Sequence, residues 1–155
     1  DQFEIKTSGS VKVLSGKKVR SFVWIDTLAH TPHYFVNGGD FKNPENVPLS
    51  GFFEVLIEGP LTLVSKTKAT MIKPSYNHAF DMGNRDARIV KKDNFFYLKD
   101  GVVGELPSSR KKLLPLFGAH ASGVNSFIKV NALRLDDAAH LRAIFEHYNT
   151  LLVTN

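Results

Sequence analysis

Alternating hydrophobic and polar positions run through the first two thirds of the chain and predict β-strands. The clearest example is residues 51–68, where two alternating runs flank the Glu-Gly-Pro of residues 58–60. A period of two is typical of a strand with one buried face, and a Gly-Pro pair favours a turn. We therefore predict a β-hairpin here, with Phe53, Val55 and Ile57 on one face of its first strand.

Shorter runs of the same kind lie on either side of this hairpin. Residues 19–26 carry apolar groups in both alternating sets, so we expect this strand to be central in the sheet or covered on its second face. Residues 37–48 are rich in Asn, Gly and Pro and predict a surface loop. The remaining expected strands are residues 3–6, 11–14, 34–36, 87–92, 95–99 and 102–106, with 69–73 extending the hairpin and turns at Asp93-Asn94 and Asp100-Gly101.

After Pro107 the hydrophobic period changes to about 3.6, which predicts helices. We expect a short first helix that Pro115 shortens, a second helix over about residues 121–130, and a long last helix. The predicted start and end residues are Ser108 or Ser109 and Gly118 for the first helix, Asn131 in a left-handed conformation for the end of the second, and Asp136 or Asp137 for the start of the third.

Strands followed by helices, without βαβ alternation, indicate an α+β fold. We predict an antiparallel, curled β-meander of about eight short strands followed by a C-terminal cap of three helices. A length of 155 residues favours a single domain over 1–155, mostly β over 1–107, with a helical cap over 108–155 that does not fold independently. No apolar run reaches the roughly 18 residues of a membrane span, so we expect no transmembrane segment.

Charge and cysteine content narrow the chemistry. The net charge of +5 permits attraction to nucleic acid, anionic lipid or an acidic partner. The basic residues are spread along the chain, and the short run at 110–112 lacks the aromatic ladder of single-strand binders, so we expect no nucleic-acid partner. A basic nucleic-acid-binding protein is the weakest of the alternative functions. The absence of cysteine excludes disulfides, thiolate metal sites and a cysteine nucleophile.

Two spacings of ionisable residues resemble functional sites. His30 and His33 are three apart, but Pro32 forbids a helical zinc motif and a third ligand is missing, which favours a polar loop. Glu54 and Glu58 could reach the separation of glycosidase carboxylates, although solvent-facing glutamates beside cross-strand lysines explain the same pattern. We predict no catalytic residue, no metal site and no cofactor.

The densest polar cluster lies between residues 76 and 88. A histidine near an aspartate can form a base and its orienting partner, and arginine can hold an anion. The cluster lacks the G-x-S-x-G context of a hydrolase serine, and charges that pair at the surface account for the same residues. If the chain binds a ligand or is a small hydrolase, the candidate residues are Tyr76, His78, Asp81 and Arg85.

The stretches GFFEVLIEGPLTLV, KPSYNHAFDMG, RKKLLPLFG and HLRAIFEHYN together resemble an uncharacterised family of secreted bacterial envelope proteins. The family shares a G-F-x-E-V-L-x-x-G hairpin, a Pro-x-Tyr-Asn segment and a C-terminal helix with Tyr-Asn, and the resemblance covers residues 51–151. It implies an exported protein, periplasmic or associated with the outer membrane, whose signal peptide has been removed. It implies no activity. Our leading hypothesis is a non-enzymatic binding or structural module that acts on an envelope protein or a surface ligand.

Overall fold

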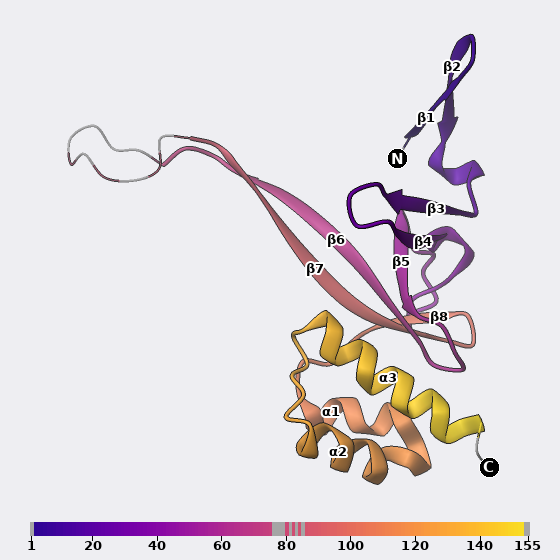
Figure 1. Cartoon of the computed structure of the whole chain (residues 1–155), viewed down its shortest axis with the longest axis vertical. Helices are drawn as coiled ribbons and strands as arrows, with labels where there is room; N and C mark the ends of the chain where they lie inside the picture. Colours follow the sequence, from indigo (N-terminus) through magenta and orange to yellow (C-terminus); the bar gives the residue numbers. More distant parts are fainter. Residues whose placement is uncertain (1, 76–79, 81, 83, 85, 154–155) are drawn as a thin grey trace.

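A computed structural model describes residues 2–75, 80, 82, 84 and 86–153, and within them the fold is α+β with antiparallel strands (Figure 1). The strands form two sheets. One is the hairpin of β1 (Gln2–Thr7) and β2 (Ser10–Ser15). The other has six strands in chain order: β3 (Ser21–Asp26), β4 (Thr31–Asn37), β5 (Phe52–Ile57), β6 (Thr62–Ile72), β7 (Arg88–Lys99) and β8 (Val102–Glu105). The predicted class is thus confirmed, but the strands do not form one meander and the larger sheet is open.

The C-terminal part contains two helical units where three separate helices were predicted. Helix α1 (Arg110–Leu113) passes through a 3-10 segment (Leu114–His120) directly into α2 (Ala121–Val130), and α3 (Ala138–Val153) follows. Pro115 lacks the amide hydrogen that a longer α-helix would need. Gly118, with φ of 52°, redirects the chain inside this unit and does not end it. The described helices lack the combination of length and hydropathy that crossing a bilayer requires.

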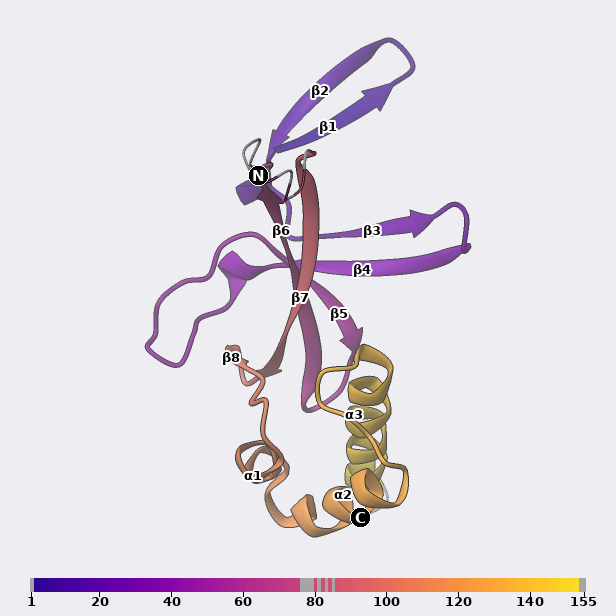
Figure 2. The same ribbon diagram turned by 90° about the vertical axis from the view of Figure 1, so that its left-hand side faces the viewer.

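Two apolar clusters cover opposite faces of the sheet near its helical end. The helix-side cluster joins strand residues such as Leu61 and Leu63 to the buried stripes of the helices. The loop-side cluster is centred on Phe53, Val64 and Val103 beneath the loop that connects β4 and β5. Strand β6 lies between the two clusters, and its residues 62–65 are all buried. The helices therefore cover one end of the sheet, and the other strands extend away from them (Figures 1 and 2).

Strand β5 contributes to both clusters because its register shifts between Val55 and Ile57. Phe53 and Val55 pack on the loop side, whereas Leu56 and Ile57 pack on the helix side. An irregularity of this kind inserts a residue into one strand and reverses the facing of those that follow. The predicted hairpin is confirmed, but the prediction that Ile57 shares a face with Phe53 and Val55 is wrong.

The predicted turn at Asp93-Asn94 is also wrong. Strand β7 passes through these residues without interruption, paired with β6 over its whole length. Asp93 lies opposite Thr67, and the Thr67 hydroxyl donates a hydrogen bond to its carboxylate. A long partner strand thus keeps two turn-prone residues extended. The tight turn at Asp100-Gly101 is confirmed, with φ of 52° and 78°.

Strand β3 lies at the edge of the six-stranded sheet, so the first predicted alternative, a central position, is wrong. The second alternative, a covered second face, holds at Phe22, where Phe3 of β1 packs, but not at the exposed Trp24. Strand β4 also begins earlier than predicted, at Thr31, and places Pro32 opposite Ile25. An edge strand with apolar residues on both faces leaves part of that surface exposed.

The helix starts follow the predictions at Ser109 and Asp137, whereas Gly118 does not end the first helix and Asn131 is not left-handed. Asp137 accepts hydrogen bonds from the amides of Ala139 and His140 at the start of α3, as an N-cap does. Asn131 follows α2 but has φ of −92°, and Ala132 takes the left-handed conformation with φ of 49°. The Asn131 side chain instead donates to the carbonyl of Phe127, which closes the helix end.

Candidate binding surface

The sequence-predicted ligand residues Tyr76, His78, Asp81 and Arg85 lie outside the described residues. A ligand site or small-hydrolase site in that segment therefore stays a prediction. The remaining candidate residues His30, His33, Glu54 and Glu58 are all described. His33 and Glu54 lie on strands, and His30 and Glu58 lie just outside them.

The structure separates the paired residues that suggested catalytic or metal sites. His30 lies in the β3–β4 turn, whereas Nδ1 of His33, on β4, is 2.7 Å from Oε1 of Glu54 on β5. Glu58 follows β5, and its main-chain carbonyl accepts a hydrogen bond from Asn149. Among the described residues, no three His, Cys, Asp or Glu side chains are grouped to hold a metal ion. Glu54 is thus paired with His33 across the sheet and not with Glu58.

The His33–Glu54 pair supports the single tryptophan of the chain. Trp24 on β3 lies directly opposite His33, and their ring centroids are 5.0 Å apart. Glu54, on β5, holds the His33 imidazole in place, so the Trp24 indole packs against a fixed ring. The exposed fraction of Trp24 is nevertheless 52%. Trp24 was not among the residues that the sequence predicted as binding residues. The available signal was a lone tryptophan in a strand with apolar residues on both faces.

The opposite face of the same hairpin is also apolar and open. Val23, Ile25 and Tyr34 are 52%, 59% and 54% exposed. Val23 and Tyr34 border a groove of about 830 Å³ whose lining also includes Val36, Val55 and Leu98. We call Val23, Trp24, Ile25 and Tyr34 the β3–β4 surface. Trp24 lies on one face of the hairpin, and Val23, Ile25 and Tyr34 lie on the other. Exposed apolar groups gathered on one element typically mark an interaction site.

An aromatic cluster at its base holds the β3–β4 surface in place. The Phe22 and Phe35 rings stack at 4.7 Å, and Phe3 and Phe52 meet Phe22 edge-on at 5.0 and 5.1 Å. Among the described strands, only β4 pairs with β3, so the outer backbone groups of β3 form a free edge. Such an edge can accept another strand.

The turn of this hairpin is ordered by Asp26. Its carboxylate accepts hydrogen bonds from the amides of Leu28 and Ala29, at 2.8 and 3.1 Å. The bonds from Ala29 and Leu28 stabilise the ionised form and lower the pKa of Asp26. A charged Asp26 therefore holds the turn while the Leu28 side chain projects outward.

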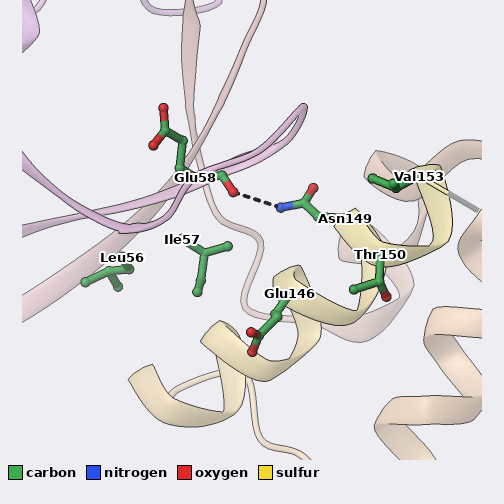
Figure 3. A pocket seen from close by; sticks show the side chains of 7 residues that line it. All are labelled: Leu56, Ile57, Glu58, Glu146, Asn149, Thr150 and Val153. Atoms are coloured by element: carbon green, nitrogen blue, oxygen red, sulfur yellow. Dashed lines mark hydrogen bonds between the residues drawn. The ribbon is translucent and has the colours of Figure 1, made fainter.

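A second hollow, of about 600 Å³, lies where the β5–β6 turn meets α3 (Figure 3). Its lining includes Leu56, Ile57, Glu58 and, from α3, Asn149 and Val153. The Asn149 side chain reaches toward the turn and donates to the carbonyl of Glu58. The polar contact across this hollow fastens the turn to the helix, and we assign the hollow to the packing of the fold.

Two further histidines, His140 and His147, contact neighbours within the fold. Nδ1 of His140 accepts a hydrogen bond from the amide of Arg134, and the His147 ring stacks on Phe127 at 4.0 Å. No protein-family model, characterised protein or solved structure matches the chain significantly. Function is therefore argued from the exposed surfaces.

Proposed function

We propose that this protein is an exported, non-enzymatic binding module of the bacterial envelope that holds a partner protein on its β3–β4 surface. The observation that carries the proposal is the pair of open apolar faces on an edge hairpin whose base is fixed by packed aromatic rings. The envelope location is supported by the resemblance of residues 51–151 to exported envelope proteins.

The chemistry of the surface suits a protein partner. Interface hot spots are enriched in tryptophan and tyrosine that are held rigidly before binding. Trp24 is held in this way, because its ring contacts the His33 imidazole and Glu54 fixes that imidazole through a hydrogen bond. The free edge of β3 adds a second mode of attachment, in which a partner strand continues the sheet through main-chain hydrogen bonds.

The described polar groups support a binding role over a catalytic one. His33 is paired with Glu54, His140 with the Arg134 amide, and His147 with the Phe127 ring. A general base needs a lone pair within reach of a substrate proton. The Nδ1 lone pair of His140 already accepts the Arg134 amide hydrogen. The His33–Glu54 pair lies against the exposed Trp24 ring, and we assign it to the support of that indole.

The test is capture of a partner by the whole chain from envelope extracts of a bacterium that carries it. We expect a specific protein to be retained, and Trp24→Ala to weaken its binding at least 30-fold, the size of a typical hot-spot loss. Val130→Ala is the control, because Val130 is an apolar residue that is even more exposed than Trp24 but lies on α2. The proposal is rejected if no specific partner is retained while the chain turns over a hydrolase substrate.

A further inference from the structure

The far ends of β6 and β7 form a two-stranded ribbon that leaves the body of the molecule. Strand β5 pairs with β6 only as far as Ser65, and β8 pairs with β7 only from Phe96 onward. Beyond these points residues 66–72 and 88–94 pair with each other alone among the described strands. Figures 1 and 2 show this segment, the distal ribbon, extending away from the helices.

One face of the distal ribbon is basic. Directly opposed residues of an antiparallel pair share a face, and Lys68 lies opposite Lys92. Lys66 and Arg88 belong to the same face, which carries no carboxylate within residues 66–72 and 88–94. Like charges directly opposite one another destabilise a strand pair. An anion bound between Lys68 and Lys92 would offset the repulsion of their charges, so this pairing favours an anionic ligand.

The outer end of the distal ribbon is apolar on both faces. Met71 and Ile89 are opposed on one face and are 66% and 64% exposed. Ile72 and Val90 lie on the other face and are also exposed. In the connection that follows, Phe80 and Met82 are exposed as well. The ribbon thus combines apolar residues at its end with Lys68 and Lys92 set behind them, while Arg88 lies beside Ile72 at the end itself.

We propose that the end of the distal ribbon docks onto the surface of an anionic lipid bilayer. A nucleic-acid groove would receive one face of a ribbon, whereas apolar groups on both faces suit immersion in the interfacial layer. The open edges of the ribbon cannot enter the hydrocarbon core, because their backbone groups would lose hydrogen bonds. Docking therefore stops at the headgroups.

The distance between the apolar end of the distal ribbon and its lysines fits docking at the headgroups. Lys68 and Ile72 are four residues apart, or about 13 Å along a strand. Flexible lysine side chains can reach back toward lipid phosphates, whose attraction extends about 8 to 10 Å at physiological salt. This inference goes beyond the proposed function, since it uses a different surface and a different class of ligand.

Vesicle flotation with the whole chain provides the test. We expect binding to phosphatidylcholine vesicles that contain phosphatidylglycerol, little binding to phosphatidylcholine alone, and loss of binding at high salt. Lys68→Gln with Lys92→Gln should weaken binding about 30-fold, since each lysine near an anionic surface contributes about fivefold. The matched control is Lys111→Gln with Lys129→Gln, which removes the same charge from exposed positions on α1 and α2.

A second pair of variants tests the apolar end. Met71→Thr with Ile89→Thr should weaken vesicle binding at least tenfold, whereas Val130→Thr with Val153→Thr should not, although these helix residues are as exposed. Circular dichroism verifies that each variant is folded. The inference is overturned if the ribbon variants bind vesicles as the parent does, if neutral vesicles bind equally well, or if the parent binds duplex DNA but no vesicles. Trp24→Ala should bind vesicles as the parent does. The lipid-docking inference and the protein-binding proposal can therefore fail independently of each other.

Discussion

At the scale of single residues, the contact between Gly59 and Asn149 shows why the β5–β6 turn requires glycine. A Cβ added to Gly59 would lie 2.1 Å from Nδ2 of Asn149, far inside van der Waals contact. The same nitrogen donates to the carbonyls of Glu58 and Leu61, at 3.4 Å each. Asn149 therefore fastens α3 to the turn at a point where only a hydrogen atom fits.

We expect Gly59→Ala to lower the free energy of unfolding by about 1–3 kcal/mol, because the added methyl group displaces the Asn149 amide. Urea denaturation measures the change. Gly9→Ala is the control, because nothing lies within 4 Å of a Cβ at that position. Equal effects of the two substitutions would contradict a special role for the Gly59–Asn149 contact.

Asp137 gives a residue-scale prediction for pH. The amides of His140 and Ala139 donate to its carboxylate and lower the pKa of Asp137 below its ordinary value. A carboxyl group with a depressed pKa stabilises the fold above its unfolded pKa, and this contribution is lost as pH falls through the folded pKa. Urea midpoints at neutral pH and near pH 3 should therefore differ less in Asp137→Asn than in the parent chain. Glu45→Gln, in the exposed β4–β5 loop, should leave the difference unchanged.

At the scale of elements, strand β6 changes character along its length. Its first residues are buried between the helix-side and loop-side clusters, and its last six are exposed in the distal ribbon. A core position and an exposed position of one strand can therefore be compared directly.

Leu63→Ala should destabilise the protein by about 2–5 kcal/mol, the usual cost of removing a fully buried leucine side chain. Met71→Ala, on the same strand, should change the free energy of unfolding by less than about 0.5 kcal/mol. Both are measured by urea denaturation. A comparable loss at Met71 would show that the ribbon end is packed and not exposed.

The alternating pattern was enough to predict most strands and the β5–β6 hairpin, and the 3.6-residue period was enough to predict α2. It could not reveal the register shift in β5, because Phe53, Val55 and Ile57 keep strict alternation in the sequence while the pairing with β6 does not. The Asp-Asn pair at 93–94 looked like a turn, and only the length of β6 keeps it extended. Of the candidate surface, the apolar character of residues 19–26 was visible, but its edge position depends on strand order, which local pattern does not encode.

At the scale of the whole molecule, the packed core and the exposed surfaces lie at different ends. The helices cover one end of the sheet (Figures 1 and 2). The β3–β4 hairpin and the distal ribbon extend away from that covered end. Trp24 and Ile25 stay more than half exposed beside a well-packed aromatic cluster. Stability of the fold alone does not account for this exposure, because exposed apolar side chains gain nothing from burial. The shape therefore argues for a module whose exposed strands meet other molecules.

The central claim is that the β3–β4 surface binds a protein, and site-specific photocrosslinking in living cells that carry the chain tests it most directly. A benzophenone amino acid at position 23 should form one discrete adduct with a partner protein, and Trp24→Ala should abolish that adduct. The same probe at position 130, on α2, should give no such adduct. Identical adduct patterns from positions 23 and 130, or a position-23 adduct that survives Trp24→Ala, would contradict the account.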